Sequence, residues 1–362
     1  MLHNIAILTG GGDAPGLNSV IRAAVKTAKL QYGAHVLGIQ DGYEGLVQKA
    51  DPWRLDMPDV AGLLYRGGTI LGTSNRGDPF HYPVERDGKI VKEDKSKELM
   101  ECLNDLRVDA LIVIGGDGSL YIANELHKMG APVVGVPKTI DNDLSATEVT
   151  FGFDTAITTA TEALDKLHTT AESHHRAMVL EVMGRDAGWI ALESGIAGGA
   201  DVILIPEIPF SWDRIYDKID GRRKVGRKFS IVVAAEGAHP SGGDRIVVES
   251  ADQTHGLDRL GGIGQQVGYE ISQNLGMDTR VTTLGHIQRG GKPSTFDRIL
   301  ATRFGVEAVH MVVKKKFGHM VALRKAKIVY VPLEEAIGKQ KFVDPDGQMV
   351  QTAEAIGISM GR

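Results

Sequence analysis

Residues 4–16 read NIAILTGGGDAPG, an apolar run that passes directly into a glycine-rich turn. The residues after the turn carry apolar side chains at helical spacing, namely Leu17, Val20, Ile21, Ala24, Val25 and Ala28. A buried strand, a tight turn and an amphipathic helix in this order begin a βαβ unit, in which the next strand lies parallel to the first. This stretch therefore favours an α/β fold built on a parallel sheet.

Further runs rich in Val, Ile, Leu and Ala predict strands at residues 35–39, 109–114, 132–136, 178–182, 201–206 and 230–235. Because these runs are continuous rather than alternating, they are typical of parallel strands covered on both faces. A second helix is expected to run from Asp154, as N-cap, to Leu167, and a third over 306–313, before Lys314–Lys316 and Gly318. We expect one sheet to end near residue 140, a second to begin near residue 178, and a strand at 328–331 followed by a helix.

The length of 362 residues exceeds that of one typical compact core, so two domains are expected. A net charge of −5 argues against a nucleic-acid or membrane partner. There is no apolar run of about 18 residues and no basic leader before an apolar stretch, so neither a membrane span nor a secretory signal is expected. The single cysteine, Cys102, fits a packing residue in a reducing compartment, and the expected location is cytoplasmic.

Two glycine-rich turns between a strand and a helix, at residues 10–16 and 115–119, are candidate phosphate sites. Glycine lets the backbone approach an anion, and the N–H groups and dipole of a helix N-terminus favour negative charge. Asp117, between glycines at a strand end, can reach a metal ion that bridges phosphate oxygens. The alternatives are turns without a ligand, an aspartate that caps its own helix and, because Asp41 ends the second strand, a nicotinamide oxidoreductase.

Residues 137–143, PKTIDND, supply paired carboxylates directly after a predicted strand. In an extended chain Asp141 and Asp143 would face the same way, so that one can accept a hydroxyl proton while the other orients metal-bound water. A turn-forming Asp/Asn cluster without a function is the alternative. Basic side chains that can clamp phosphate are also present, namely Arg176, Arg185, Arg280, His286 and Arg289.

Five motifs resemble the phosphofructokinase family in order and spacing, over about residues 3–320: GGDAPG at 11–16, GGDG at 115–118, TIDND at 139–143, MGR at 183–185 and GHIQRGG at 285–291. The resemblance implies two Rossmann-like three-layer αβα domains with mostly parallel sheets and an active site in the cleft between them. Residues 1–150 plus about 285–340 would form the nucleotide-binding domain, and residues 151–284 plus the C-terminal segment the fructose 6-phosphate-binding domain. The implied activity is ATP- and Mg²⁺-dependent phosphorylation of fructose 6-phosphate to fructose 1,6-bisphosphate in glycolysis.

The resemblance also implies roles for single residues. Asp141 would be the base that accepts the proton of the sugar 1-hydroxyl, and Asp117 the Mg²⁺ carboxylate, with Asp143 assisting. Contact with the transferring phosphoryl group is implied for Gly12, Thr139 and Arg185, and donor binding for Gly12, Arg76, Gly116, Asp117, Gly118 and Ser119. Binding of the sugar phosphate is implied for Arg176, Met183, Gly184, Glu236, Arg280, His286 and Arg289.

In this family Arg176 and Arg280 come from the neighbouring subunit, so the resemblance implies a homo-oligomer, a tetramer or a dimer, with shared active sites. It also implies an allosteric enzyme, and Arg22 and Lys26 match part of the effector site of the short bacterial members. His168 stands where an arginine is usual and Asp201 where a glutamate is usual. These residues therefore do not predict control by nucleoside diphosphate or phosphoenolpyruvate.

Two positions bear on the phosphoryl donor. Gly118 is typical of ATP-dependent members, because a residue without a side chain leaves room for the α-phosphate and the nucleoside. Lys138 is typical of pyrophosphate-dependent members, but the Gly118/Lys138 pair resembles a branch of longer enzymes that generally use ATP. ATP is the expected donor, and a pyrophosphate-dependent fructose 6-phosphate 1-phosphotransferase is the alternative. A regulator that binds these ligands without catalysis is a third hypothesis, which the complete set of motif residues disfavours.

Overall fold

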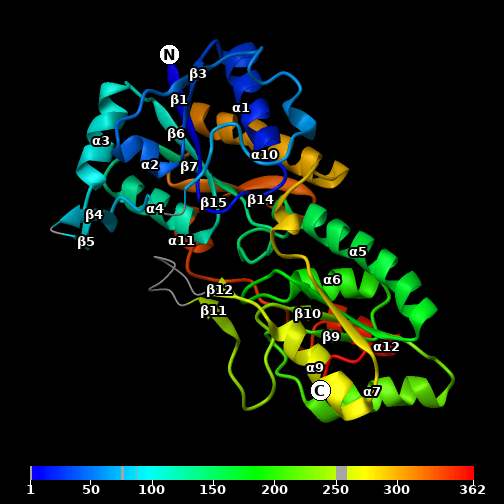
Figure 1. Cartoon of the computed structure of the whole chain (residues 1–362). Helices are drawn as coiled ribbons and strands as arrows, with labels where there is room; N and C mark the ends of the chain where they lie inside the picture. The colour runs from blue at the N-terminus through cyan, green and yellow to red at the C-terminus, as the bar shows by residue number, and fades with distance from the viewer. Residues whose placement is uncertain (1, 75–76, 87, 250–258) are drawn as a thin grey trace. The chain divides into compact units, whose positions relative to one another are not determined.

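The computed structural model describes residues 2–74, 77–86, 88–249 and 259–362, and the chain divides into two compact units (Figure 1). Unit 1 comprises Met1–Ile140, Leu144–Asp154 and Arg289–Gln340, and unit 2 comprises Asp141–Asp143, Thr155–Gln288 and Lys341–Arg362. Each unit therefore combines segments that are far apart in the sequence. The acidic segment Asp141–Asp143 belongs to unit 2, although the residues on both sides of it belong to unit 1.

Unit 1 is built on a seven-stranded sheet in the order β15-β14-β7-β6-β1-β2-β3. Its strands are β1 (Asn4–Thr9), β2 (His35–Ile39), β3 (Trp53–Leu55), β6 (Ala110–Gly115), β7 (Val133–Pro137), β14 (His319–Arg324) and β15 (Lys327–Pro332). The inner strands are parallel, and the edge strands β3 and β15 are antiparallel to their neighbours. The strands predicted for this part of the chain are confirmed to within one residue at each end.

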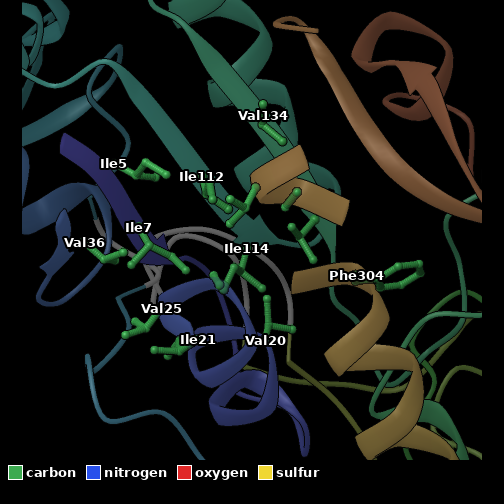
Figure 2. Packing of buried hydrophobic residues seen from close by; sticks show 14 of the residues in the cluster. Ile5, Ile7, Val20, Ile21, Val25, Val36, Ile112, Ile114, Val134 and Phe304 are labelled. Carbon is green, nitrogen blue, oxygen red and sulfur yellow. The ribbon is translucent and has the colours of Figure 1, made fainter. Parts of the chain in front are cut away.

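Helices cover both faces of this sheet (Figure 1). One face carries α1 (Leu17–Tyr32) and α10 (Thr295–Val313), and the other carries α2 (Tyr43–Val47), α3 (Ser96–Asp105), α4 (Asp117–Lys128) and α11 (Leu333–Ala336). Side chains of β1 alternate between the two cores, because successive residues of a strand point to opposite faces. Ile5 and Ile7 pack with α1 and α10 (Figure 2), and Ala6 and Leu8 pack with the other helices. Cys102 is buried in this second core, as predicted.

Unit 2 has a smaller, fully parallel sheet in the order β13-β8-β10-β9. Its elements are α5 (Phe153–His174), β8 (Ala177–Val182), α6 (Trp189–Ala197), β9 (Val202–Leu204), α7 (Trp212–Lys224), β10 (Ser230–Ala235), α9 (Ile263–Leu275), β13 (Thr279–Thr283) and α12 (Gln348–Ala355). Helices α7 and α9 pack on one face. On the other face Gly195 of α6 lies against Ile203, and Gly198 lies against Leu164 of α5. Both units thus have the predicted αβα layers.

Short elements complete the fold, namely η1 (Leu63–Tyr65), β4 (Tyr82–Arg86), β5 (Lys89–Glu93), β11 (Val247–Glu249), β12 (Arg259–Leu260) and η2 (Gly285–Arg289). Within the described ranges, no helix combines the length and the apolarity needed to span a bilayer.

The prediction that Asp154 is the N-cap of α5 is wrong, because the helix already begins at Phe153. Asp154 lies in its first turn, where the carboxylate accepts a 2.5 Å hydrogen bond from the Ser294 hydroxyl.

The contact between α1 and α10 gives a stability prediction. A methyl group added at Gly305 of α10 would lie 2.5 Å from the Val20 carbonyl oxygen and 2.8 Å from the Ala23 Cβ atom of α1. We therefore expect Gly305→Ala to lower the free energy of unfolding by about 1–3 kcal/mol, measured as a lower Tm by calorimetry.

Gly221 is the matched control, because it also lies inside a helix, α7, but an added methyl group there meets no atom within 4 Å. Gly221→Ala should raise the free energy of unfolding by roughly 0.5–1 kcal/mol through helix propensity. A Gly305→Ala protein as stable as the wild type would contradict the close approach of the two helices.

Candidate functional site

Two glycine-rich turns lie side by side at the edge of the unit 1 sheet that the carboxyl ends of its parallel strands form. Strands β1 and β6 are parallel neighbours, and their carboxyl ends lead into the turns before α1 and α4. The Gly10 N–H donates a 2.9 Å hydrogen bond to the Ile114 carbonyl oxygen, which ties the two strand ends together. The Thr73 hydroxyl donates to the Gly11 carbonyl oxygen at 2.5 Å and supports the first turn. The edge therefore presents two helix N-termini, which favour an anion.

Ser119 is the residue against which the two turns pack. A Cβ atom at Gly10 would lie 2.6 Å from the Ser119 Oγ atom, and one at Gly115 would lie 2.3 Å from the Ser119 Cβ atom. Ser119 itself is buried. An added methyl group at Gly115 would therefore collide with the Ser119 Cβ atom, and one at Gly10 would displace the Ser119 hydroxyl. The Ser119 side chain, expected to bind the donor, contacts both turns.

Two cationic side chains reach the first turn at Gly12. The Lys138 ammonium donates a hydrogen bond to the Gly12 carbonyl oxygen, and Lys138 is buried. The Arg289 guanidinium lies over the same residue, because a Cβ atom at Gly12 would sit 1.9 Å from its Nη1 atom. In the part of the chain that the structure describes, the buried Nε of Arg289 has no hydrogen-bond partner. Positive charge thus converges on a turn whose backbone is already suited to an anion.

Asp117 is the first residue of α4 and is half-buried. Its Oδ1 atom accepts a 2.9 Å hydrogen bond from the Gly338 N–H. No group of three or more potential metal ligands occurs among the residues described. Mg²⁺ commonly binds through one or two carboxylates and completes its shell with substrate phosphates and water. The single carboxylate of Asp117 therefore fits an Mg²⁺ ion whose other ligands are phosphate oxygens and water.

The other residues expected near the donor differ in their surroundings. The Thr139 carbonyl oxygen accepts a 2.8 Å hydrogen bond from the Thr150 hydroxyl. Gly116 precedes α4, and a Cβ atom there would lie 3.3 Å from the Lys138 carbonyl oxygen. Gly118 is exposed, and a Cβ atom there would meet no atom within 4 Å. Arg76 lies outside the described residues.

The acidic segment Asp141–Asp143 is not extended. Asn142 has a φ of 53°, in the left-handed region, so the chain turns between the two aspartates. The expectation that both carboxylates face the same way in an extended chain is therefore wrong. Asp141 and Asn142 are buried, with 8% and 4% of their surface exposed, whereas Asp143 is half-buried. A buried carboxylate of this kind can serve as a base if a substrate hydroxyl reaches it.

At the carboxyl ends of β8 and β10, three of the residues expected to bind the sugar phosphate come together in unit 2, namely Met183, Gly184 and Glu236. Glu236 donates its backbone N–H to the Val182 carbonyl oxygen at 2.8 Å, and its Oε1 atom accepts from the Arg185 N–H at 3.2 Å. Gly184 has a φ of 140°, which turns the chain sharply after Met183. His286 follows β13 at the same edge and is exposed.

A polar cavity of about 470 Å³ adjoins this edge, within the size range of small-molecule sites. Its lining includes Arg185, Asp186, His239 and Arg245. Asp186 forms an ion pair with Arg245 and lies 3.8 Å from the Arg185 Nε atom. Asp186, His239 and Arg245 are not among the residues predicted from the sequence. The position of Asp186, directly after the MGR motif, was the available signal.

Arg176 and Arg280 lie at the opposite end of the strands of this sheet, close to the residues at which β8 and β13 begin. Both form ion pairs with Asp278, and the Arg176 Nε–Asp278 Oδ2 distance is 2.5 Å. Slight desolvation raises the pKa of Asp278, but the hydrogen bonds from the two arginines outweigh it and leave this pKa below its ordinary value. Arg176 precedes β8 and Met183 follows it, so the two are separated by roughly 20 Å along the strand. One copy of unit 2 does not bring these arginines to Met183.

His168 and Asp201, the positions that depart from the effector site, have partners inside unit 2. Asp201 forms an ion pair with Arg222 at 2.6 Å and accepts a 2.9 Å hydrogen bond from the Ile231 N–H. Burial raises the pKa of Asp201 above its ordinary value. The His168 Nε2 atom lies 2.6 Å from the Gly198 carbonyl oxygen. Both side chains thus hold elements of this unit together.

Comparison with known proteins gives concordant results. The model of the family described as Phosphofructokinase matches residues 4–312. The chain is 55% identical to "ATP-dependent 6-phosphofructokinase 2" of Clostridium perfringens, over 99% of this chain and 98% of that protein. It is 49% identical to "Pyrophosphate--fructose 6-phosphate 1-phosphotransferase" of Streptomyces coelicolor, over 99% of each chain.

Among solved structures, the phosphofructokinase of Pichia pastoris superposes with a TM-score of 0.80 at 35% identity. The match covers 98% of this chain but only 36% of the Pichia chain. The family resemblance inferred from the five motifs is confirmed, and the oxidoreductase alternative is excluded by a family match over most of the chain. The chain belongs to the phosphofructokinase family.

Proposed function

We propose that this chain transfers the γ-phosphoryl group of ATP to the 1-hydroxyl of fructose 6-phosphate, giving fructose 1,6-bisphosphate and ADP. The observation that carries the proposal is the convergence of Lys138 and Arg289 on Gly12, at an edge formed by two glycine-rich turns. Phosphoryl transfer requires positioning and neutralisation of charge more than covalent chemistry, and this edge supplies both. Unit 1 would bind the donor, and unit 2 the sugar phosphate. The cytoplasmic location expected from the sequence stays a prediction.

Different residues of this chain would accept the proton, stabilise the transferring phosphoryl group and hold Mg²⁺. The Asp141 carboxylate accepts the proton of the 1-hydroxyl while this oxygen bonds to the γ-phosphorus, and the bond to the β,γ-bridging oxygen breaks. The Gly12 N–H, Thr139 and Arg185 stabilise the charge on the transferring group. Mg²⁺ held by Asp117, with Asp143 assisting, would neutralise donor phosphate charge.

The surroundings of Lys138 and Gly118 support ATP as the donor. The Lys138 ammonium is engaged with the Gly12 carbonyl oxygen, so it does not have to occupy the space next to the β-phosphate. The open space at Gly118 leaves room for the rest of a nucleotide. The ATP-dependent relative from Clostridium is also more similar to this chain than the pyrophosphate-dependent relative from Streptomyces.

Binding of the sugar 6-phosphate would require two copies of the chain. Met183, Glu236 and His286 lie beyond the carboxyl ends of the strands of the unit 2 sheet. Arg176 and Arg280 lie near the amino ends of the same strands. The arginines would therefore clamp the phosphate in a site of the neighbouring subunit. This arrangement makes a homo-oligomer, a dimer or a tetramer, necessary for full activity.

Replacement of the base tests the proposal. Asp141→Asn should lower kcat for fructose 1,6-bisphosphate formation by about 10²–10⁴-fold, because the amide cannot accept the hydroxyl proton. The KM values for both substrates should change little, since the side chain keeps its size. An aldolase-coupled assay measures turnover, and circular dichroism verifies folding. A turnover number close to that of the wild type would remove Asp141 from this role.

Gly118→Asp tests the choice of donor. The position is open, so the protein should fold, but a carboxylate beside the α-phosphate should lower kcat/KM for ATP by about 100-fold through like-charge repulsion. Gly118→Ala is the control, because it occupies the same space without charge and should remain within about threefold of the wild type. Equal values of kcat/KM for the Asp variant and the wild type would argue against a nucleotide at this position.

Co-expression of two defective chains tests the shared site. Arg280→Ala alone should raise the KM for fructose 6-phosphate, and Asp141→Asn alone should keep at most about a hundredth of the wild-type kcat. In mixed oligomers, a site with Asp141 from one chain and Arg280 from the other is intact, so random mixing should restore about a quarter of the wild-type rate at low sugar phosphate. Activity no higher than the sum of the separate variants would show that Arg280 acts within its own chain or not at all.

A further inference from the structure

Lys341 contacts the acidic segment with both its side chain and its backbone. All the residues involved belong to unit 2. The Lys341 ammonium donates a 2.8 Å hydrogen bond to Asn142 Oδ1, and the Lys341 N–H donates a 2.7 Å bond to the Asp143 carbonyl oxygen. The ammonium also lies 5.7 Å from the centroid of the Trp189 ring, and the Trp189 Nε1–H donates to the Lys341 carbonyl oxygen at 2.8 Å.

Asn142 is the residue between the two aspartates, and its conformation has to be maintained. A φ of 53° is disfavoured for a residue with a side chain, and such conformations persist where the surroundings hold them. The direction of the Asp141 carboxylate depends on this turn, because Asp141 directly precedes Asn142. Lys341 fixes the turn from both ends, at the Asn142 side chain and at the Asp143 carbonyl group.

The segment that carries Lys341 is itself anchored in unit 2. The Val343 N–H donates a 2.8 Å hydrogen bond to Glu207 Oε1, and the same carboxylate accepts from the Gly188 N–H at 2.9 Å, next to α6. Burial raises the pKa of Glu207 above its ordinary value, although the backbone hydrogen bonds oppose this effect. Val343 is buried as well. The backbone next to Lys341 is therefore held in place by hydrogen bonds and by the burial of Val343.

We propose that Lys341 is a positioning residue for phosphoryl transfer, which acts through Asn142 to keep the Asp141 carboxylate directed at the hydroxyl it deprotonates. This inference rests on the proposed function. Lys341 need not touch either substrate. Its effect should therefore appear in the chemical step, because a misdirected base weakens transition-state stabilisation and leaves substrate binding unchanged.

Lys341→Met removes the ammonium and keeps the backbone contacts and the aliphatic chain. We expect kcat to fall about tenfold while the KM values for fructose 6-phosphate and ATP stay within about twofold of the wild type. Lys341→Arg keeps a cationic donor and should retain at least about a third of the wild-type kcat. Lys218→Met is the matched control, since the Lys218 ammonium donates to the Gly357 carbonyl oxygen in the same C-terminal segment, and kcat should stay within about twofold.

A double-mutant cycle separates positioning from general support of the fold. Asn142→Gly tolerates the positive φ and removes the acceptor of the Lys341 ammonium, so Lys341→Met should cause little further loss of kcat in that background. Losses that multiply would overturn the inference, and so would a Lys341→Met enzyme with a wild-type kcat. A wild-type protein that forms no fructose 1,6-bisphosphate with either donor would instead reject the proposed function.

Discussion

The close approach of two glycine-rich turns at neighbouring strand ends is the constraint on which the candidate site depends. Ser119 fills the space between Gly10 and Gly115, and a Cβ atom at either position would collide with the Ser119 side chain. This packing holds the starts of α1 and α4 at one edge of the unit 1 sheet. Helix N-termini leave backbone N–H groups unsatisfied, so the edge favours an anionic ligand before any charged side chain is considered.

Charged side chains then add to the attraction of this edge for an anion. A chain with a net charge of −5 nevertheless brings Lys138 and Arg289 to the same glycine, from segments about 150 residues apart. Asp117 adds one carboxylate at the start of α4, a donor set that suits a cation shared with phosphate oxygens. Under the proposed function, the glycine-rich turns at this end of the sheet bind the donor, and the buried carboxylate of Asp141 accepts the proton.

The sequence predicted the fold class well, because the parallel strands are continuous apolar runs with a local signal. It did not predict β13, whose residues 279–283 are half-buried or exposed and include an arginine and three threonines. The turn at Asn142 was also missed, since nothing local distinguishes an extended Asp-Asn-Asp from one in the left-handed region. The roles of Asp278 and Lys341 were not predicted. Their contacts join residues about 100 and 200 positions apart, and such contacts leave no periodic pattern in the sequence.

Phosphorus-31 NMR of a reaction mixture tests the central claim most directly, because it observes donor and product together. With fructose 6-phosphate, Mg²⁺ and ATP, we expect a new sugar 1-phosphate resonance that grows in step with ADP, and no such resonance when a chelator removes Mg²⁺. Release of inorganic phosphate from ATP without a sugar 1-phosphate signal would contradict the account. So would a sugar 1-phosphate signal that appears with pyrophosphate and never with ATP.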